Sequence, residues 1–287
     1  MQIKQFNFTT SDNTRLFSKI WLPEEFNPDK VIVFHHGLGE HCDRYQNLIQ
    51  SLIDQQYSFF SYDMRGHGRS EGNRGDAENI QQLVIDLEDF IYFIKKEYKV
   101  NQPILLGHSL GGLITSYFAV RHSNQEEIKA LVLSAPALEV SLNFLQTIKY
   151  YIGLFLFYVK PDLILKSEIN PQFLSHDKTV VQKYIDDPLV HPYLSVRLGI
   201  DIMNAIKIVH RHASKIKIPT WIGHGTMDKI TSSTGSEKFF RLIRSENKVL
   251  RLYQGLYHEI FNEVTNIPLE DLKAWILSLE NTSNHKY

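Results

Sequence analysis

A serine framed by glycines lies near the middle of the chain, in the stretch Gly107-His108-Ser109-Leu110-Gly111. An apolar run at residues 103–106 precedes this stretch, and a run with helical character follows it. The G-x-S-x-G pattern is typical of a nucleophile elbow, a sharp strand-to-helix turn that presents a serine hydroxyl. Glycines two residues to either side let the backbone segments pass without a clash at Cβ. We therefore predict that Ser109 is a nucleophile.

A serine nucleophile requires a general base and an acidic residue that orients that base. Downstream of an elbow, the expected chain order is an aspartate or glutamate and then a histidine. Asp228 follows a predicted strand at residues 218–222, and His258 follows another at residues 249–253. Three residues of the required types, in the required order and all past strand ends, predict a triad of Ser109, Asp228 and His258.

Other residues compete for these roles, because the chain contains 13 histidines. His108 adjoins the nucleophile, but the side chain before an elbow serine is expected to point away from Oγ. His224 is close to Asp228 in sequence and is expected to pack or cap the turn. Glu139, which follows the strand at residues 130–134, is the alternative acid.

The oxyanion of an acyl-transfer intermediate requires two backbone N–H donors. In enzymes with such an elbow, one donor belongs to the residue after the nucleophile and the other to the loop after the third strand. These positions are Leu110 and Leu38, the latter in the turn His36-Gly37-Leu38.

Neither a metal nor a nucleotide cofactor is predicted. Possible ligands follow the strand at residues 31–34, namely His35, His36, Glu40 and His41. Their spacing matches none of the usual metal-binding patterns. The stretch Gly66-His67-Gly68 lacks the full dinucleotide spacing and is interpreted as a loop beside the active site. Cys42 has no glycine framing and is interpreted as a structural thiol.

The positioning of these residues follows from short apolar strands that alternate with helices. After an N-terminal hairpin, strands are predicted at residues 31–34, 57–62, 104–106, 130–134, 218–222 and 249–253. Helices are predicted at residues 45–56, 79–98, 110–121, 234–244 and 269–279. This alternation indicates an α/β fold with a mostly parallel sheet covered by helices on both faces. Such sheets bind ligands at the carboxyl edge, where the three triad residues would meet.

The alternation stops at residues 137–213, which are predicted to form a helical cap inserted into a core of residues 1–136 and 214–287. Residues 144–159, FLQTIKYYIGLFLFYV, would form a helix that is apolar nearly all round. Two interpretations stay open: a buried cap helix, or a lipid-facing gate that admits an acyl chain. In the second, Leu154, Phe157 and Tyr158 would contact the substrate or the lipid surface.

Composition excludes several classes of function. The net charge of −1 does not favour a nucleic-acid partner or a polybasic membrane patch. A single cysteine precludes an intrachain disulfide, so a reducing, cytoplasmic location is expected. No apolar run approaches the ~18 to 20 residues that a spanning helix needs, and the N-terminus lacks a secretory signal pattern. Membrane contact, if any, would be peripheral and made through the cap.

The chain resembles the monoacylglycerol lipase and lysophospholipase branch of the α/β-hydrolase superfamily. The stretches that carry the resemblance are HGLGEH (residues 36–41) with Arg44-Tyr45, DMRGHGRS (63–70), GHSLGG (107–112), DDPLVH (186–191), Gly223-His224-Gly225 with Asp228, and Tyr257-His258-Glu259. They extend over nearly the whole chain, from about residue 5 to 280. The resemblance implies the triad given above, a helical cap and lipid-ester substrates. The cap is its least matched part.

Several activities are compatible with such a scaffold, because the fold does not determine the reaction. Monoacylglycerol and lysophospholipid are the expected substrates, and a carboxylesterase, amidase or aminopeptidase is the alternative. A non-catalytic binding module is disfavoured, because no member of the triad is missing.

Overall fold

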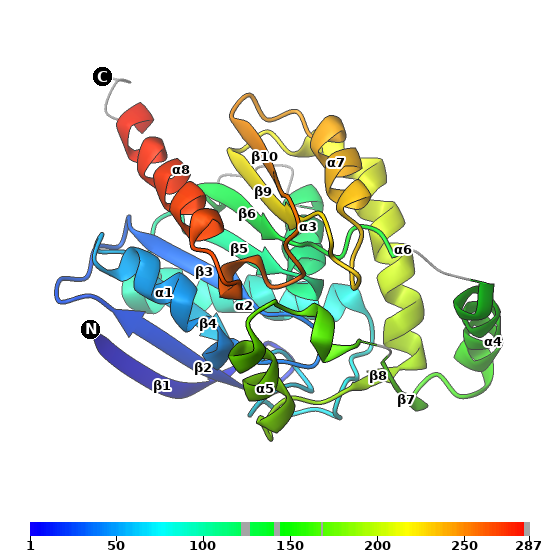
Figure 1. The fold of residues 1–287 in the computed structure, drawn as a ribbon. Helices are drawn as coiled ribbons and strands as arrows, with labels where there is room; N and C mark the ends of the chain where they lie inside the picture. The colour runs from blue at the N-terminus through cyan, green and yellow to red at the C-terminus, as the bar shows by residue number, and fades with distance from the viewer. Residues whose placement is uncertain (122–126, 141–143, 168, 284–287) are drawn as a thin grey trace.

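The computed structural model describes residues 1–121, 127–140, 144–167 and 169–283. Its centre is an eight-stranded sheet with the order β1-β2-β4-β3-β5-β6-β9-β10 (Figure 1). The strands are β1 (Gln2–Thr9), β2 (Arg15–Leu22), β3 (Val31–His35), β4 (Ser58–Tyr62), β5 (Ile104–His108), β6 (Ala130–Ser134), β9 (Thr220–Gly225) and β10 (Lys248–Tyr253). β2 is antiparallel to both β1 and β4, and the remaining pairs are parallel.

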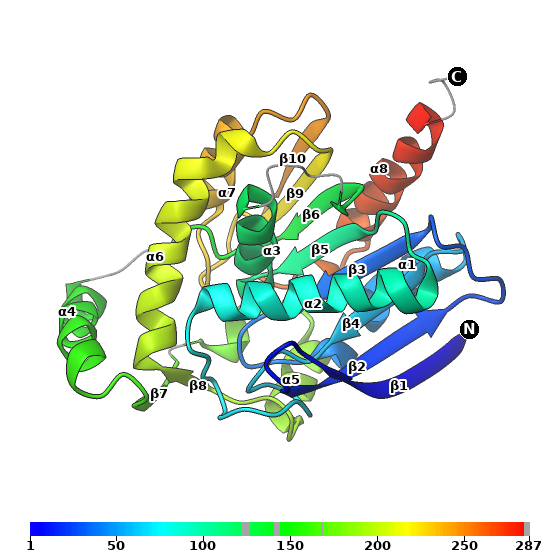
Figure 2. The same ribbon diagram turned by 180° about the vertical axis from the view of Figure 1, so that it is seen from behind.

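Helices cover both faces of this sheet, as Figures 1 and 2 show from opposite sides. One face carries α1 (Gln46–Ile53) and α8 (Ile267–Ser283) over one buried apolar cluster. The other face carries α2 (Ile80–Tyr98), α3 (Leu110–Arg121), α6 (Val196–His212) and α7 (Ser233–Leu242) over a second cluster. Strands β3 to β6 are buried along their full length because both of their faces are covered. The predicted α/β architecture is confirmed.

The predicted cap region connects β6 to β9. It contains α4 (Phe144–Val159), β7 (Ile164–Lys166), α5 (Lys178–Asp186), β8 (Tyr193–Ser195) and α6. The antiparallel pair of β7 and β8 was not predicted, because each strand has only three residues and β7 is exposed throughout. In Figure 1, α4 lies on the outer side of α6, away from the sheet. No helix within the described residues combines the length and apolar character needed to cross a bilayer.

The segment that leads into α6 is one of the places where the predicted cap region contacts the rest of the protein. The amide of His191 donates to the carbonyl of Gly39 at 2.9 Å, and the amide of Ser195 donates to that of Gly75 at 2.8 Å. Arg197 forms an ion pair with Asp76. This part of the cap therefore rests directly on the loops after β3 and β4.

Candidate active site

Ser109 lies at the junction of β5 and α3 with a backbone φ of 53°. A non-glycine residue in this left-handed region is strained, and such strain is characteristic of a nucleophile elbow. A Cβ at Gly111 would collide with the carbonyl oxygen of His35, and one at Gly107 would collide with the carbonyl of Gly111. The glycines on either side of Ser109 are therefore required by the close approach of these backbone segments.

Asp228 and His258 lie in the loops after β9 and β10 and contact each other directly. The Nδ1–H of His258 donates to Oδ2 of Asp228 at 2.7 Å. The second oxygen of Asp228 accepts from the backbone amides of Ile230, at 2.7 Å, and Thr231, at 3.1 Å. The carboxylate is therefore held in one orientation, and the imidazole presents Nε2 as its free nitrogen.

The charges around this pair oppose the effect of burial. Burial alone would raise the pKa of Asp228, but His258 and a second histidine, His224, hold that pKa well below its usual range. Burial alone would lower the pKa of His258, whereas the negative charges of Asp228, Glu259 and Glu40 raise it above its ordinary value. The arrangement therefore stabilises a protonated His258 beside an ionised Asp228. A general base requires this stabilisation, because it becomes charged when it takes up a proton.

Ser109 and His258 line one pocket, together with Leu38. Oγ of Ser109 takes part in none of the hydrogen bonds that the structure gives for the described residues. Catalytic hydrogen bonds are often long without substrate and tighten when it binds. Two of the three residues predicted to form a triad, Ser109 and His258, thus line one cavity, and the third, Asp228, orients His258.

The loop after β3 lies against the nucleophile. A Cβ on Gly37 would lie 3.1 Å from Cβ of Ser109, so this loop approaches as closely as a glycine allows. The amide N–H groups of Leu38 and Leu110 have no hydrogen-bond partner among the described residues. Both positions are therefore available as donors next to Ser109, where an oxyanion hole is needed.

A buried charge network lies beside this loop, and the sequence analysis did not predict it. Arg44 donates to the carboxylate of Glu40 at 2.6 Å and to that of Glu259 at 2.7 Å. Glu40 also accepts from the amide of Gly37, at 2.6 Å, and from the hydroxyl of Tyr45, at 2.7 Å. The network therefore connects the predicted oxyanion loop to the loop that carries His258.

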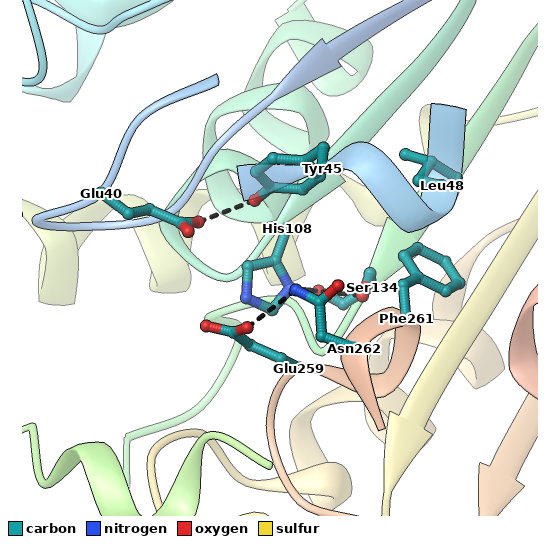
Figure 3. A pocket seen from close by; sticks show the side chains of 8 residues that line it. All are labelled: Glu40, Tyr45, Leu48, His108, Ser134, Glu259, Phe261 and Asn262. Carbon is teal, nitrogen blue, oxygen red and sulfur yellow. Dashed lines mark hydrogen bonds between the residues drawn. The ribbon is translucent and has the colours of Figure 1, made fainter. Parts of the chain in front are cut away.

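The same network lines a second hollow behind His108, which Figure 3 shows from close by. Glu40, Tyr45 and Glu259 gather around the His108 ring (Figure 3). Nδ1 of His108 lies 3.1 Å from the carbonyl oxygen of Ser134. Its ring centroid is 4.7 Å from that of His258. His108 therefore lines the site, although its position before the elbow was expected to direct it away from Oγ of Ser109.

The remaining candidates serve the structure. Nε2 of His35 lies 3.1 Å from the Tyr62 hydroxyl, and Nδ1 of His36 lies 2.8 Å from the carbonyl oxygen of Gly37. Cys42 is buried, and burial raises the pKa of its thiol well above the usual range. No group of three or more possible metal ligands is found within the described part of the chain.

The cap residues Leu154, Phe157 and Tyr158 do not line the pocket that holds Ser109. Leu154 is half-buried, Phe157 is 36% exposed and Tyr158 is 84% exposed. Other large side chains of α4 are exposed as well, and they include Ile148, Tyr151, Ile152, Phe155 and Val159. Large apolar side chains of α4 are therefore open to solvent, while Gly153 lies close to Ile200 of α6.

Comparison with known proteins agrees with this geometry. A family model described as serine aminopeptidase, S33 matches residues 27–265. The monoglyceride lipase of Rattus norvegicus is 31% identical over 274 residues, which cover 94% of this chain and 89% of the rat protein. The monoacylglycerol lipase of Mycolicibacterium smegmatis is 28% identical and covers 96% of this chain and 97% of its own.

A solved structure shows the same likeness in three dimensions. The crystal structure of Paleococcus ferrophilus monoacylglycerol lipase matches with a TM-score of 0.81 and 29% identity, covering 97% of this chain and 100% of that one. The chain therefore belongs to the serine aminopeptidase S33 family of the α/β-hydrolase superfamily, in its monoacylglycerol lipase-like branch.

Proposed function

We propose that this protein hydrolyses carboxylic esters of lipids through an acyl-enzyme on Ser109, with monoacylglycerol as the substrate. The observation that carries this proposal is the single pocket in which a strained elbow serine and an Asp228-oriented His258 meet. The relatives that support it are named monoglyceride and monoacylglycerol lipases.

The proposed reaction has two steps. His258 Nε2 removes the proton from Ser109 as Oγ attacks the ester carbonyl, and Asp228 stabilises the resulting imidazolium. The amides of Leu38 and Leu110 would hold the oxyanion, and His258 then protonates the departing alcohol. Water attacks the acyl-enzyme with His258 as the base, which releases the fatty acid and restores Ser109.

The charges of the pocket favour a glycerol head group over a phosphate. Arg44 is the only cation among the residues that line the Ser109 pocket, and two carboxylates already accept its N–H groups. Glu40, Glu259 and Arg44 together carry a net charge of −1, which would repel a phosphate. The carboxylate oxygens can accept hydrogen bonds from the hydroxyl groups of glycerol.

Paired substrates test this preference. Monooleoylglycerol and oleoyl lysophosphatidate carry the same acyl chain and differ by the phosphate on the head group. We expect kcat/KM to be higher for monooleoylglycerol. An equal or higher value for the lysophospholipid would refute the assignment of the head group and leave the hydrolase proposal intact.

We also propose that α4 brings the protein to lipid surfaces as a peripheral contact. Its large exposed side chains give one end of the cap an apolar surface: Ile148, Tyr151, Ile152, Phe155, Tyr158 and Val159. An apolar surface of this kind is typical of a protein that contacts a membrane or a partner. A substrate dissolved in a bilayer or micelle would reach the site from that surface.

The name of the matched family suggests a second candidate, an aminopeptidase. The net negative charge beside Ser109 could hold the α-amino group of a peptide. Hydrolysis of aminoacyl p-nitroanilides at rates comparable to those of monoacylglycerol would support this candidate.

Labelling with a fluorophosphonate tests whether Ser109 is an activated nucleophile. We expect the wild-type protein to be labelled at Ser109 and the Ser109→Ala variant to remain unlabelled. Ser51→Ala is the matched control, because Ser51 only donates to the carbonyl of Leu48 on α1. Labelling of Ser109→Ala to the wild-type level would contradict the assignment.

A further inference from the structure

His224 provides a second imidazole at the Asp228 carboxylate. It lies in β9, four residues before Asp228, and is fully buried. Its Nε2 is 3.0 Å from Oδ2 of Asp228, the same oxygen that accepts from His258 Nδ1 at 2.7 Å. One carboxylate oxygen therefore lies between two histidines, one in β9 and the other in the loop after β10.

The hydrogen-bond partners of His224 define its tautomer. Nε2 faces an anionic oxygen, so this nitrogen must carry a hydrogen and act as the donor. Nδ1 lies 2.8 Å from Oγ of Ser236, in the first turn of α7. In neutral His224, Nδ1 is then an acceptor, and the Ser236 hydroxyl donates to it. A continuous chain of donors thus runs from Ser236 through His224 to Asp228.

The other contacts of Asp228 show what the hydrogen bond from His224 contributes. Oδ1 is held by the backbone amides of Ile230 and Thr231. Oδ2 lies 2.9 Å from the Thr231 hydroxyl, but that hydroxyl is also 3.2 Å from the carbonyl oxygen of Ala135 and has only one hydrogen to donate. Apart from His258, the donors to Oδ2 within the described residues are therefore His224, at 3.0 Å, and the Thr231 hydroxyl, which is shared with the carbonyl of Ala135.

We propose that His224, oriented by Ser236, is a positioning residue that holds the Asp228 carboxylate in place and shares its negative charge with His258. The proposal rests on the triad proposed above. An N–H donor at Oδ2 disperses part of the charge that would otherwise act on the His258 imidazolium. It also prevents the carboxylate from rotating away from His258 during the proton transfers.

Other groups face His258 and set the background for this effect. The charged ones are Asp228, Glu259 and Glu40, and the His108 ring packs against His258. Of these groups, only Asp228 has a hydrogen bond to His224 among the described residues. A change at His224 therefore reaches His258 through the shared carboxylate.

The test compares the dependence of kcat/KM on pH in the wild type and in three variants, with a soluble short-chain ester as substrate. His224→Leu removes the donor, and Asp228 then acts more strongly on the His258 imidazolium. We expect the acid limb of the profile to move upward by about one pH unit, which lowers kcat/KM about tenfold at pH values below the midpoint. His224→Gln retains an N–H at the position of Nε2, and we expect it to restore a profile close to that of the wild type.

Ser236→Ala is the third variant, and it keeps the proposal testable if His224→Leu does not fold. It leaves the imidazole in place but removes the donor that orients it, so we expect a smaller upward shift. His210→Leu is the matched control, because His210 is a partly buried histidine that bonds only to the carbonyl of Leu138. We expect this control to leave the profile unchanged.

Two results would overturn the proposal. One is an unchanged midpoint in folded His224→Leu and in Ser236→Ala. The other is an equal loss of activity in His224→Gln and His224→Leu, which would indicate a purely structural role. Failure of the proposed triad is distinguishable, because it would appear as full activity in Ser109→Ala, whatever the behaviour of the His224 variants.

Discussion

Arg44 and Glu259 form a buried ion pair, 2.7 Å between Nη1 and Oε1, directly beside the proposed base. Glu259 follows His258 in the chain, and the same guanidinium also pairs with Glu40, which accepts from the amide of Gly37. The side chain of Arg44 is only 9% exposed. One cation therefore connects the proposed oxyanion loop to the loop of the base.

Removal of that cation should damage both stability and catalysis. Arg44→Met would leave two buried carboxylates without their partner, and breaking such a pair typically costs about 3 to 5 kcal/mol. We expect a marked fall in the thermal midpoint and a loss of ester hydrolysis. Arg69→Met is the control, because Arg69 pairs with Asp43 at a more exposed position. Equal midpoints for the two variants would contradict the connecting role of Arg44.

The pH dependence of hydrolysis follows from the raised pKa of His258. Only neutral imidazole can accept the serine proton, so kcat/KM should fall as the pH decreases through the pKa of His258. That midpoint should lie above the ordinary value of about 6.5. Glu259→Gln removes one of the charges that raise the pKa, so its acid limb should lie at lower pH. An acid limb that moves to higher pH in this variant would show that the sign of the argument is wrong.

Asp228 should be essential for the tautomer of His258. Asp228→Asn keeps the shape of the side chain but can present an N–H to Nδ1, and a similar change in a serine protease reduces the rate roughly 10⁴-fold. The matched control is Glu139→Gln, because Glu139 accepts from the Thr234 hydroxyl and has no hydrogen bond to His258 in the structure. A kcat near the wild-type value in Asp228→Asn, together with a loss of activity in Glu139→Gln, would show that Glu139 is the acid instead.

The strands, the helices and the elbow could be predicted from the sequence because each has a local signal. Apolar runs define β3 to β6, and the glycines around Ser109 reflect close backbone contacts within the elbow. Asp228 and His258 could be proposed from chain order and from their places after strands.

The Arg44 network and the contact between His224 and Asp228 could not be predicted in this way. The Arg44 network depends on pairing across loops, because Arg44 and Glu259 are 215 residues apart. His224 is only four residues from Asp228 and was expected to pack or cap the turn, but the sequence did not show that its Nε2 faces the carboxylate. Of the network, only Glu40 was considered as a chemical group, as one of four possible metal ligands with His35, His36 and His41, and their spacing did not support a metal site. The environment of α4 also escaped prediction, because a helix that is apolar nearly all round carries no periodic signal for its buried face.

Replacement of exposed apolar residues on α4 should weaken lipid binding without unfolding the protein. We expect Tyr151→Ser, Phe155→Ser and Tyr158→Ser, combined, to reduce liposome binding at least tenfold, because burial of each side chain in lipid contributes about 1.5 to 3 kcal/mol. Hydrolysis of a short soluble ester and the thermal midpoint should change little.

A matched control for this variant lies on other parts of the surface. Tyr92→Ser, Val264→Ser and Ile267→Ser, combined, remove exposed apolar side chains from outside the cap. Equal liposome binding by the two triple variants would refute a specific role for α4. A large fall in the midpoint of the α4 variant would instead identify these residues as part of the cap core.

Steady-state hydrolysis of monooleoylglycerol by purified wild-type protein and by Ser109→Ala tests the central claim most directly. We predict release of oleate and glycerol by the wild type and a loss of about 10⁶-fold in kcat in the variant, because the triad acts as a unit. Circular dichroism should show that the variant remains folded. Turnover by Ser109→Ala at the wild-type rate, or no ester hydrolysis by folded wild-type protein, would contradict the account.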